Sequence, residues 1–167
     1  LLRHCVGYVA LATICDCVPL LGENRVLARA GLTALSASDH PGLKALRSVS
    51  GMSGEVTSDD VSFRLGPRIN AAGRLGHADR ALALLMADDP EDAKTAAREL
   101  EDKNLARQDL EAAILLDARQ KARAEPDDAR VLVLADERWH AGVVGIVANR
   151  IASEFGKPAI LIALKGE

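Results

Sequence analysis

Aromatic residues are almost missing from this sequence of 167 residues. Phe, Trp and Tyr together make up only 2% of the chain, whereas apolar residues as a class make up 49%. The chain can therefore bury a real core, but that core must be built from Ala, Leu, Val and Ile. Such a composition favours helices and parallel strands, and hence an α/β fold, over an antiparallel sandwich.

Long apolar runs and a secretion signal are missing too. No run reaches the roughly 18 apolar residues that indicate a membrane-spanning helix, so we expect no membrane contact. The first residues lack the basic start and the small-residue cleavage site of a signal peptide. The three cysteines, Cys5, Cys15 and Cys17, lack the spacing of a zinc knuckle. We therefore expect buried, reduced thiols in a cytoplasmic protein.

The sequence also lacks an initiator Met and an excess of positive charge. It starts inside an apolar pattern and stops just after an apparent strand, so we expect a piece cut from a longer protein. The net charge of −3 argues against nucleic-acid binding. However, acids prevail over residues 88–130 and bases over residues 1–87. This distribution leaves room for a local basic site in the first half.

What is present predicts a helix-rich first part. Apolar spacing and helix-terminal residues predict helices over 1–15, 24–37, 41–49 and 78–87, with Ser58 as a further N-cap. Residues 66–76 read as a Gly/Ala/Arg loop after a Gly66-Pro67 break. Pro90 opens a helix that runs to about residue 124, or roughly 50 Å. Its thin apolar stripe is typical of a helix that bridges two bodies, and it lacks the heptads of a coiled-coil arm.

The last part of the chain predicts a β-α-β unit. Residues 130–135 and 158–163 are short apolar runs typical of buried strands. The helix between them, over 142–155, has apolar residues on one face and ends at Gly156. Two strands joined by a helix in this way are expected to be parallel.

Asp16 is the first candidate for chemistry. It ends an apolar helix, between two cysteines and before Pro19. A carboxylate in such a setting is costly to bury unless it is paired or binds a metal, and Mg²⁺ or Mn²⁺ prefers carboxylate oxygens. The alternative is an ordinary Asp in a turn.

Two further segments could bind a nucleic acid. In LGPRINAAGRLGH, over 65–77, Arg68, Asn70 and Arg74 could offer forked donors to phosphate, or one arginine could tie the segment to an acid of the long helix. Later, Trp139 and His140 lie between the first strand and the last helix. Trp139 could stack on a base and His140 could contact a phosphate. The alternative is a packed Trp139 and a capping His140.

Three stretches of the chain, 10–20, 62–75 and 139–150, resemble the RecJ family of 5′-to-3′ single-stranded DNA exonucleases in the DHH phosphoesterase superfamily. The resemblance follows the whole chain in order and spacing. It implies the C-terminal part of a DHH catalytic domain over 1–88, a connecting helix over 89–125, and the start of a β-α-β DHH-associated domain over 126–167.

The resemblance also implies a site. It makes Asp16 a ligand of a catalytic Mn²⁺ or Mg²⁺, in a parent enzyme that uses two ions. It places Arg68, Asn70 and Arg74 near the DNA backbone or its 5′ phosphate. It further implies roles in DNA repair and recombination, action on single-stranded DNA with a possible single-strand-binding protein as partner, and a monomer in the cytoplasm.

The chain departs from the family in what it does not contain. The Asp-x-Asp, Asp-His-His and Gly-Gly-Gly-His motifs and the OB-fold are absent, so the resemblance implies that this chain alone is inactive. Two other interpretations stay open. One is another DHH enzyme, such as an oligoribonuclease or a cyclic-dinucleotide phosphodiesterase. The other is a non-catalytic nucleic-acid-binding relative.

Overall fold

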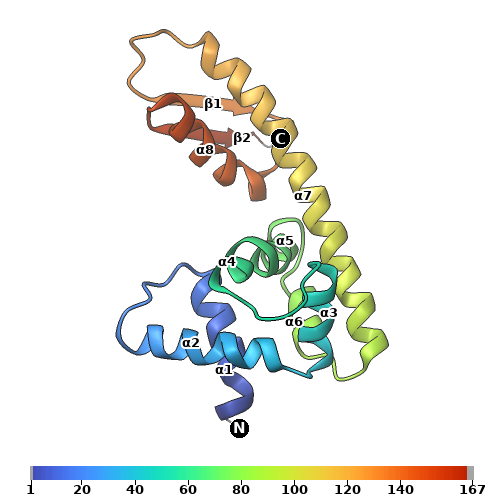
Figure 1. Ribbon diagram of the computed structural model, residues 1–167. Coiled ribbons are helices and arrows are strands. Elements are labelled where there is room, and N and C mark those ends of the chain that lie inside the picture. Colours follow the sequence, from blue (N-terminus) through green and yellow to red (C-terminus); the bar gives the residue numbers. More distant parts are fainter. Residues whose placement is uncertain (1, 165–167) are drawn as a thin grey trace. The chain divides into compact units, whose positions relative to one another are not determined.

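The computed structural model describes the backbone of residues 2–164 and the side chains from Cys5 onward. It divides into two compact units, one up to Asn104 and one from Leu105. The elements appear in Figure 1 in this order: α1 (Leu2–Cys15), α2 (Gly22–Ala37), α3 (Pro41–Val49), α4 (Ser58–Asp60), the π-helix η1 (Val61–Leu65), α5 (Gly66–Arg74), α6 (Asp79–Leu85), α7 (Pro90–Ala124), β1 (Leu132–Asp136), α8 (Ala141–Phe155) and β2 (Ala159–Ala163).

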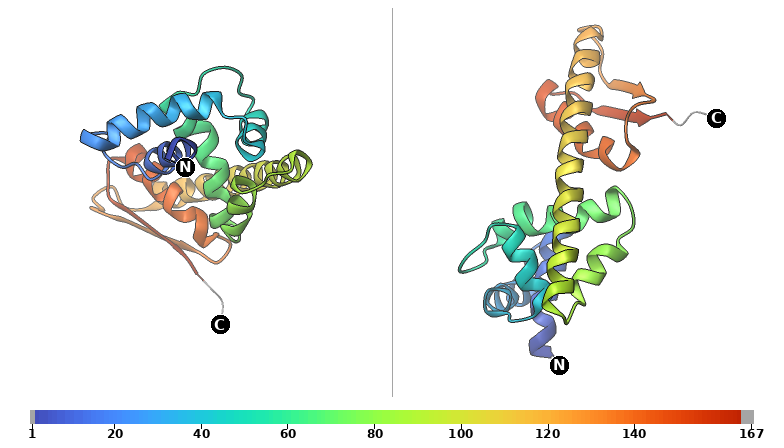
Figure 2. Two further views of the ribbon diagram at one scale, coloured as in Figure 1. Left: turned by 90° about the horizontal axis from the view of Figure 1, so that it is seen from below. Right: turned by 90° about the vertical axis from the view of Figure 1, so that its right-hand side faces the viewer.

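The first unit is a helical body built on close contact between small residues. The helices α1 and α2 lie side by side (Figure 2), and Gly31 of α2 faces α1. A Cβ placed on Gly31 would lie 2.3 Å from the carbonyl oxygen of Val6 and 2.4 Å from the Cβ of Ala10. Because the helices are this close, Ala and Leu fill the core without large aromatic side chains. Its fully buried members include Ala10, Leu46, Val61, Ala72, Leu84, Ala93, Ala97 and Leu100.

The segment predicted as a loop over 66–76 is helical instead. The π-helix η1 passes directly into α5, because Leu65 keeps a right-handed helical backbone. Pro67 lies in the first turn of α5, and its ring is accommodated directly after the π-helical turn. The prediction of a Gly66-Pro67 break was therefore wrong. Ser58 is also not the N-cap: Thr57 takes that place and forms a capping box with Asp60.

The long helix α7 forms over 35 residues, as predicted. Asp89 caps its start, because its Oδ1 accepts hydrogen bonds from the backbone N–H groups of Glu91 (2.8 Å) and Asp92 (3.0 Å). Acids occupy its first turn, and Lys121 and Arg123 its last turn. Both placements suit the helix dipole.

The second unit contains the predicted β-α-β arrangement. The strands β1 and β2 are parallel, with Leu132 opposite Ala159. The helix α8 packs against β2 and ends at Gly156, which takes the left-handed conformation with φ of 64°. The buried side of α8 consists of Val143, Val147 and Ile151.

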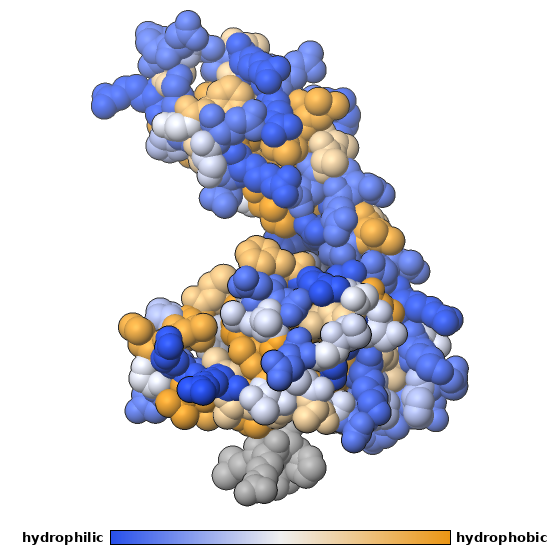
Figure 3. Space-filling model, in the orientation of Figure 1, coloured by the Kyte–Doolittle hydropathy of each residue, from blue (hydrophilic) through white to orange (hydrophobic). Residues whose placement is uncertain are grey.

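The prediction of buried cysteines is only partly correct. Cys5 and Cys17 are exposed and Cys15 is half-buried, and all three are free thiols. The surface also carries exposed apolar side chains near the start of α2, among them Leu21 and Val26, where Figure 3 shows apolar surface. Within residues 2–164, no helix is both long enough and apolar enough to cross a membrane.

Candidate metal and nucleic-acid site

The helix α5 separates the predicted phosphate-binding residues onto different faces. Asn70 and Arg74 are four residues apart, so they lie on one face of α5, and both are exposed. Arg68 lies two residues before Asn70 and points elsewhere, with 14% of its side chain exposed. The three residues therefore do not form one cluster.

Arg68 joins α5 to α7 and to the preceding segments. Its Nε and one Nη donate to the two carboxylate oxygens of Glu101, the second bond being 3.1 Å long. It also donates to the carbonyl oxygens of Arg64 at 2.7 Å and Val49 at 3.5 Å. Of the two roles that the sequence left open for an arginine here, this geometry matches the structural tie. The acid of the long helix is Glu101.

Arg64 is a structural arginine that the sequence did not single out. Its guanidinium donates to the carboxylate of Asp60 (3.1 Å) and to the carbonyl oxygens of Ser50 (2.7 Å) and Gly51 (2.6 Å). Arg64 precedes Arg68 by four residues. A helical reading of this segment would therefore have placed the two arginines on the same inward face.

Asp16 lies in the turn that ends α1. Its N–H donates to the carbonyl oxygen of Ala12 at 3.0 Å, and the N–H of Val18 donates to Thr13 at 3.1 Å. Cys17 takes a left-handed conformation with φ of 54°, which is uncommon for any residue except Gly. The Asp16 side chain is exposed. The structure thus presents this carboxylate at a strained turn rather than burying it.

The surroundings of Asp16 include the start of α5. The Cys15 side chain touches Gly66, and burial, together with the charge of Cys17, raises the pKa of the Cys15 thiol to about 11. Cys15 is therefore a neutral packing group at neutral pH. Because Asp16 follows Cys15 directly, it lies one residue from this contact with the start of α5.

Asp16 offers a suitable ligand for a metal ion, but one carboxylate alone does not make a metal site. A carboxylate oxygen is the ligand that Mg²⁺ and Mn²⁺ prefer. Within the part of the chain that the structure describes, however, no group of three or more His, Cys, Asp or Glu residues could hold a metal ion. Asp16 is therefore a single carboxylate of the right kind, and the described residues around it do not complete a metal site.

Trp139 and His140 belong to the second unit and have structural partners there. Trp139 is 5% exposed, and its Nε1 donates to Asp117 at 2.9 Å, while the ammonium of Lys121 lies 5.5 Å from the ring centroid. No ring face is left for a base, so we leave Trp139 out of the proposed site. His140 is the N-cap of α8: its Nδ1 accepts a hydrogen bond from the N–H of Gly142 at 3.1 Å.

The charges around Trp139 form a connected network. Hydrogen bonds from Arg138, and then from Lys121, hold the pKa of Asp136 far below its usual range. Arg138 also contacts Asp117 at 3.1 Å. This arrangement fixes the segment between β1 and α8 and uses the donors of Arg138 within the protein.

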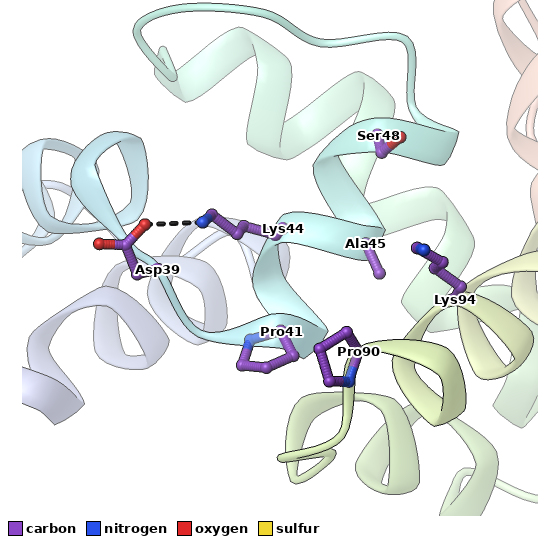
Figure 4. A pocket seen from close by; sticks show the side chains of 7 residues that line it. All are labelled: Asp39, Pro41, Lys44, Ala45, Ser48, Pro90 and Lys94. Carbon is purple, nitrogen blue, oxygen red and sulfur yellow. Dashed lines mark ion pairs between the residues drawn. The ribbon is translucent and has the colours of Figure 1, made fainter.

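The hollow drawn in Figure 4 is separate from all of the predicted site residues. It has a volume of about 320 Å³ and lies between α3 and the start of α7. Lys44 pairs with Asp39 at 2.7 Å, and Lys94 pairs with Glu91 at 2.6 Å. Since both cations already have acidic partners, we assign this hollow no ligand.

Comparison with known proteins points to one family. The chain is 43% identical to the single-stranded-DNA-specific exonuclease RecJ of Thermus thermophilus over 92% of its own length, and 36% identical to RecJ of Escherichia coli over 99%. A crystal structure of T. thermophilus RecJ with Mg²⁺ superposes on 95% of the chain with a TM-score of 0.84 and 41% identity. This chain is homologous to a segment of RecJ.

The match covers only part of the RecJ proteins. The chain spans 22% of the T. thermophilus protein and 30% of the E. coli protein. A second crystal structure, of RecJ bound to manganese, superposes with a TM-score of 0.81 and is covered to 40%. No family model matches the chain. The RecJ likeness establishes the helix-rich α/β fold, whereas the roles of single residues rest on the geometry above.

Proposed function

We propose that this chain is part of a RecJ-type exonuclease, a metal-dependent enzyme that digests single-stranded DNA from its 5′ end in DNA repair and recombination. The observation that carries the proposal is the match of sequence and fold to RecJ along almost the whole chain. The parent enzyme uses two Mn²⁺ or Mg²⁺ ions and works as a monomer in the cytoplasm, with a single-strand-binding protein as a partner. Residues 1–88, 89–125 and 126–167 are parts of its catalytic domain, connecting helix and associated domain.

Within this proposal the residues of the first unit have three roles, which are metal binding, phosphate binding and positioning. Asp16 holds one side of the metal site with its exposed carboxylate. When bound, the metal ions polarise the scissile phosphate and lower the pKa of a water molecule. Asn70 and Arg74, on the exposed face of α5, hold the phosphates of the strand. Arg68 and Glu101 keep α5 fixed on α7, so that this face stays in place.

The test is the Asp16→Ala variant of the whole enzyme. We expect release of nucleotides from single-stranded DNA with Mn²⁺ to disappear, while DNA affinity measured without metal stays within a few-fold, because many groups hold the strand and one carboxylate is lost. A natural control is Asp39→Ala, which removes an exposed carboxylate that pairs with Lys44. Activity of Asp16→Ala within a few-fold of the unmodified enzyme would contradict the metal role.

A further inference from the structure

Gly66 occupies a place where no side chain fits. A Cβ built on it would lie 2.8 Å from the Sγ of Cys15 and 2.9 Å from the carbonyl oxygen of Val61. Both distances are shorter than non-bonded contacts allow. The Gly66 N–H also donates to Val61, which closes the π-helical turn before α5. The missing side chain therefore creates a seat for the thiol of Cys15 at the start of α5.

The seat lies one residue from Asp16. Cys15 is the last residue of α1, and the turn that follows is tied to the helix by the Asp16 N–H, which donates to Ala12, and the Cys17 N–H, which donates to Ile14 at 3.1 Å. Because these bonds make the turn part of the helix end, any shift of Cys15 away from Gly66 moves Asp16 as well.

We propose that Gly66 is a positioning residue for Asp16. By seating the Cys15 thiol, it lets the end of α1 close on the start of α5 and holds the Asp16 carboxylate at a fixed place at the end of α1. The inference rests on the proposed role of Asp16 as a metal ligand. It adds that the glycine is needed because both the Cys15 thiol and the Val61 carbonyl oxygen lie where its side chain would be.

The experiment measures Mn²⁺ binding by the whole enzyme without DNA, for instance from the electron paramagnetic resonance signal of free Mn²⁺. Gly66→Ala should weaken binding by about 10- to 100-fold, the range seen when groups that orient a metal ligand are lost. Cys15→Ala combined with Gly66→Ala removes the conflict with the Sγ but leaves the one with the Val61 carbonyl oxygen, and should restore part of the lost affinity. Gly73→Ala is the matched control, because it makes the same change on the same helix where the nearest atom, the Cβ of Ala78, is 4.0 Å away.

If Gly66→Ala lowers the melting temperature but keeps its Mn²⁺ affinity, the seat is structural only and the proposal fails. If the double variant binds as weakly as Gly66→Ala, the conflict lies with the Val61 carbonyl and the pairing with Cys15 is wrong. If Gly66→Ala does not fold, the double variant carries the test, and its failure to fold counts against the seat. Asp16→Ala in the same assay isolates the proposed function: unchanged Mn²⁺ binding there would remove the metal role itself.

Discussion

Three arginines within eleven residues, Arg64, Arg68 and Arg74, have different surroundings. Arg64 and Arg68 donate to backbone carbonyls and to one acid each, and Arg68 is mostly buried. Arg74 stands at the exposed end of α5. Burial, rather than residue type, therefore separates Arg68, which holds the fold, from Arg74, which faces outward.

We expect Arg68→Ala to lower the stability of the fold and Arg74→Ala to leave it nearly unchanged. Arg68→Ala should lower the free energy of unfolding by about 1.5–3 kcal/mol, because Glu101 loses its charged hydrogen-bond donors. Arg74→Ala should change it by less than about 0.5 kcal/mol, as is usual for exposed positions. Thermal unfolding of both variants measures this, and a double-mutant cycle of Arg68 with Glu101 checks the partner.

Binding of single-stranded DNA should depend on Arg74 more than on Arg68. In the whole enzyme, Arg74→Ala should flatten the dependence of single-strand affinity on salt by about 0.7 in logarithmic slope, the value for one lost phosphate contact. Arg74→Lys should restore binding only in part, because an ammonium lacks the planar fork. An unchanged slope in Arg74→Ala would remove the α5 face from the proposed DNA contact.

The raised pKa of the Cys15 thiol predicts that the stability of the fold depends on pH. Its pKa is raised from 9.0 to about 11, chiefly by burial. Below pH 9 the thiol is protonated in both the folded and the unfolded chain, so its full contribution to stability is present. Between pH 9 and 11 only the unfolded thiol ionises, so stability falls as pH rises. The loss should be about 1–2 kcal/mol after allowance for partial exposure.

Chemical unfolding at pH 9 and pH 11 tests this for the unmodified chain and for Cys15→Ala. Burial also raises the pKa of Tyr8, so part of the decline belongs to that residue and persists in the variant. An equal decline in both proteins would show that Cys15 does not contribute.

At the scale of elements, the helix pairs of the first unit depend on glycines that allow close approach. Gly31→Ala should lower the free energy of unfolding by about 1–3 kcal/mol, since the new methyl group would meet the Val6 carbonyl and Ala10. Gly145→Ala in α8 is the control, because nothing lies within 4 Å of its added methyl group. It should stabilise the chain by up to about 1 kcal/mol through helix propensity. A stable Gly31→Ala protein would mean that α1 and α2 can separate at little cost.

The elements that could be predicted from sequence are those whose signals are local. The helix α7 carries its own start signal at Asp89-Pro90 and no internal breaker, and the β-α-β segment alternates clear apolar runs with a Gly stop. The helix α5 was missed because Gly66-Pro67 was taken as a break, although proline suits a first turn. The Arg68–Glu101 contact joins residues 33 positions apart, which periodicity cannot pair. The burial of Trp139 likewise depends on Asp117 and Lys121 of another element.

At the scale of the whole molecule, charged residues and candidate site residues are unevenly placed, with the candidate metal ligand and the exposed arginine both in the first unit. The acidic excess of residues 88–130 lies mostly in the short segments before and after α7, because α7 itself carries nearly equal numbers of acids and bases. Many of the α7 acids pair with bases, as Glu111 does with Arg150 at 2.9 Å. The net charge of −3 is therefore a poor guide to the potential near α5.

The last prediction concerns this chain by itself. We expect the purified 167-residue chain to release no nucleotides from single-stranded DNA with Mn²⁺ or Mg²⁺. The reason is the ligand count: two-metal hydrolysis needs several carboxylates or imidazoles around the ions, and the described residues contain no such group of three. Full-length RecJ of T. thermophilus, 43% identical over the shared segment, is the positive control. Circular dichroism should first show that the chain is helical, so that inactivity is not mistaken for unfolding. Nucleotide release that disappears in Asp16→Ala would show that this segment assembles a complete metal site, and the ligand count given above would be wrong.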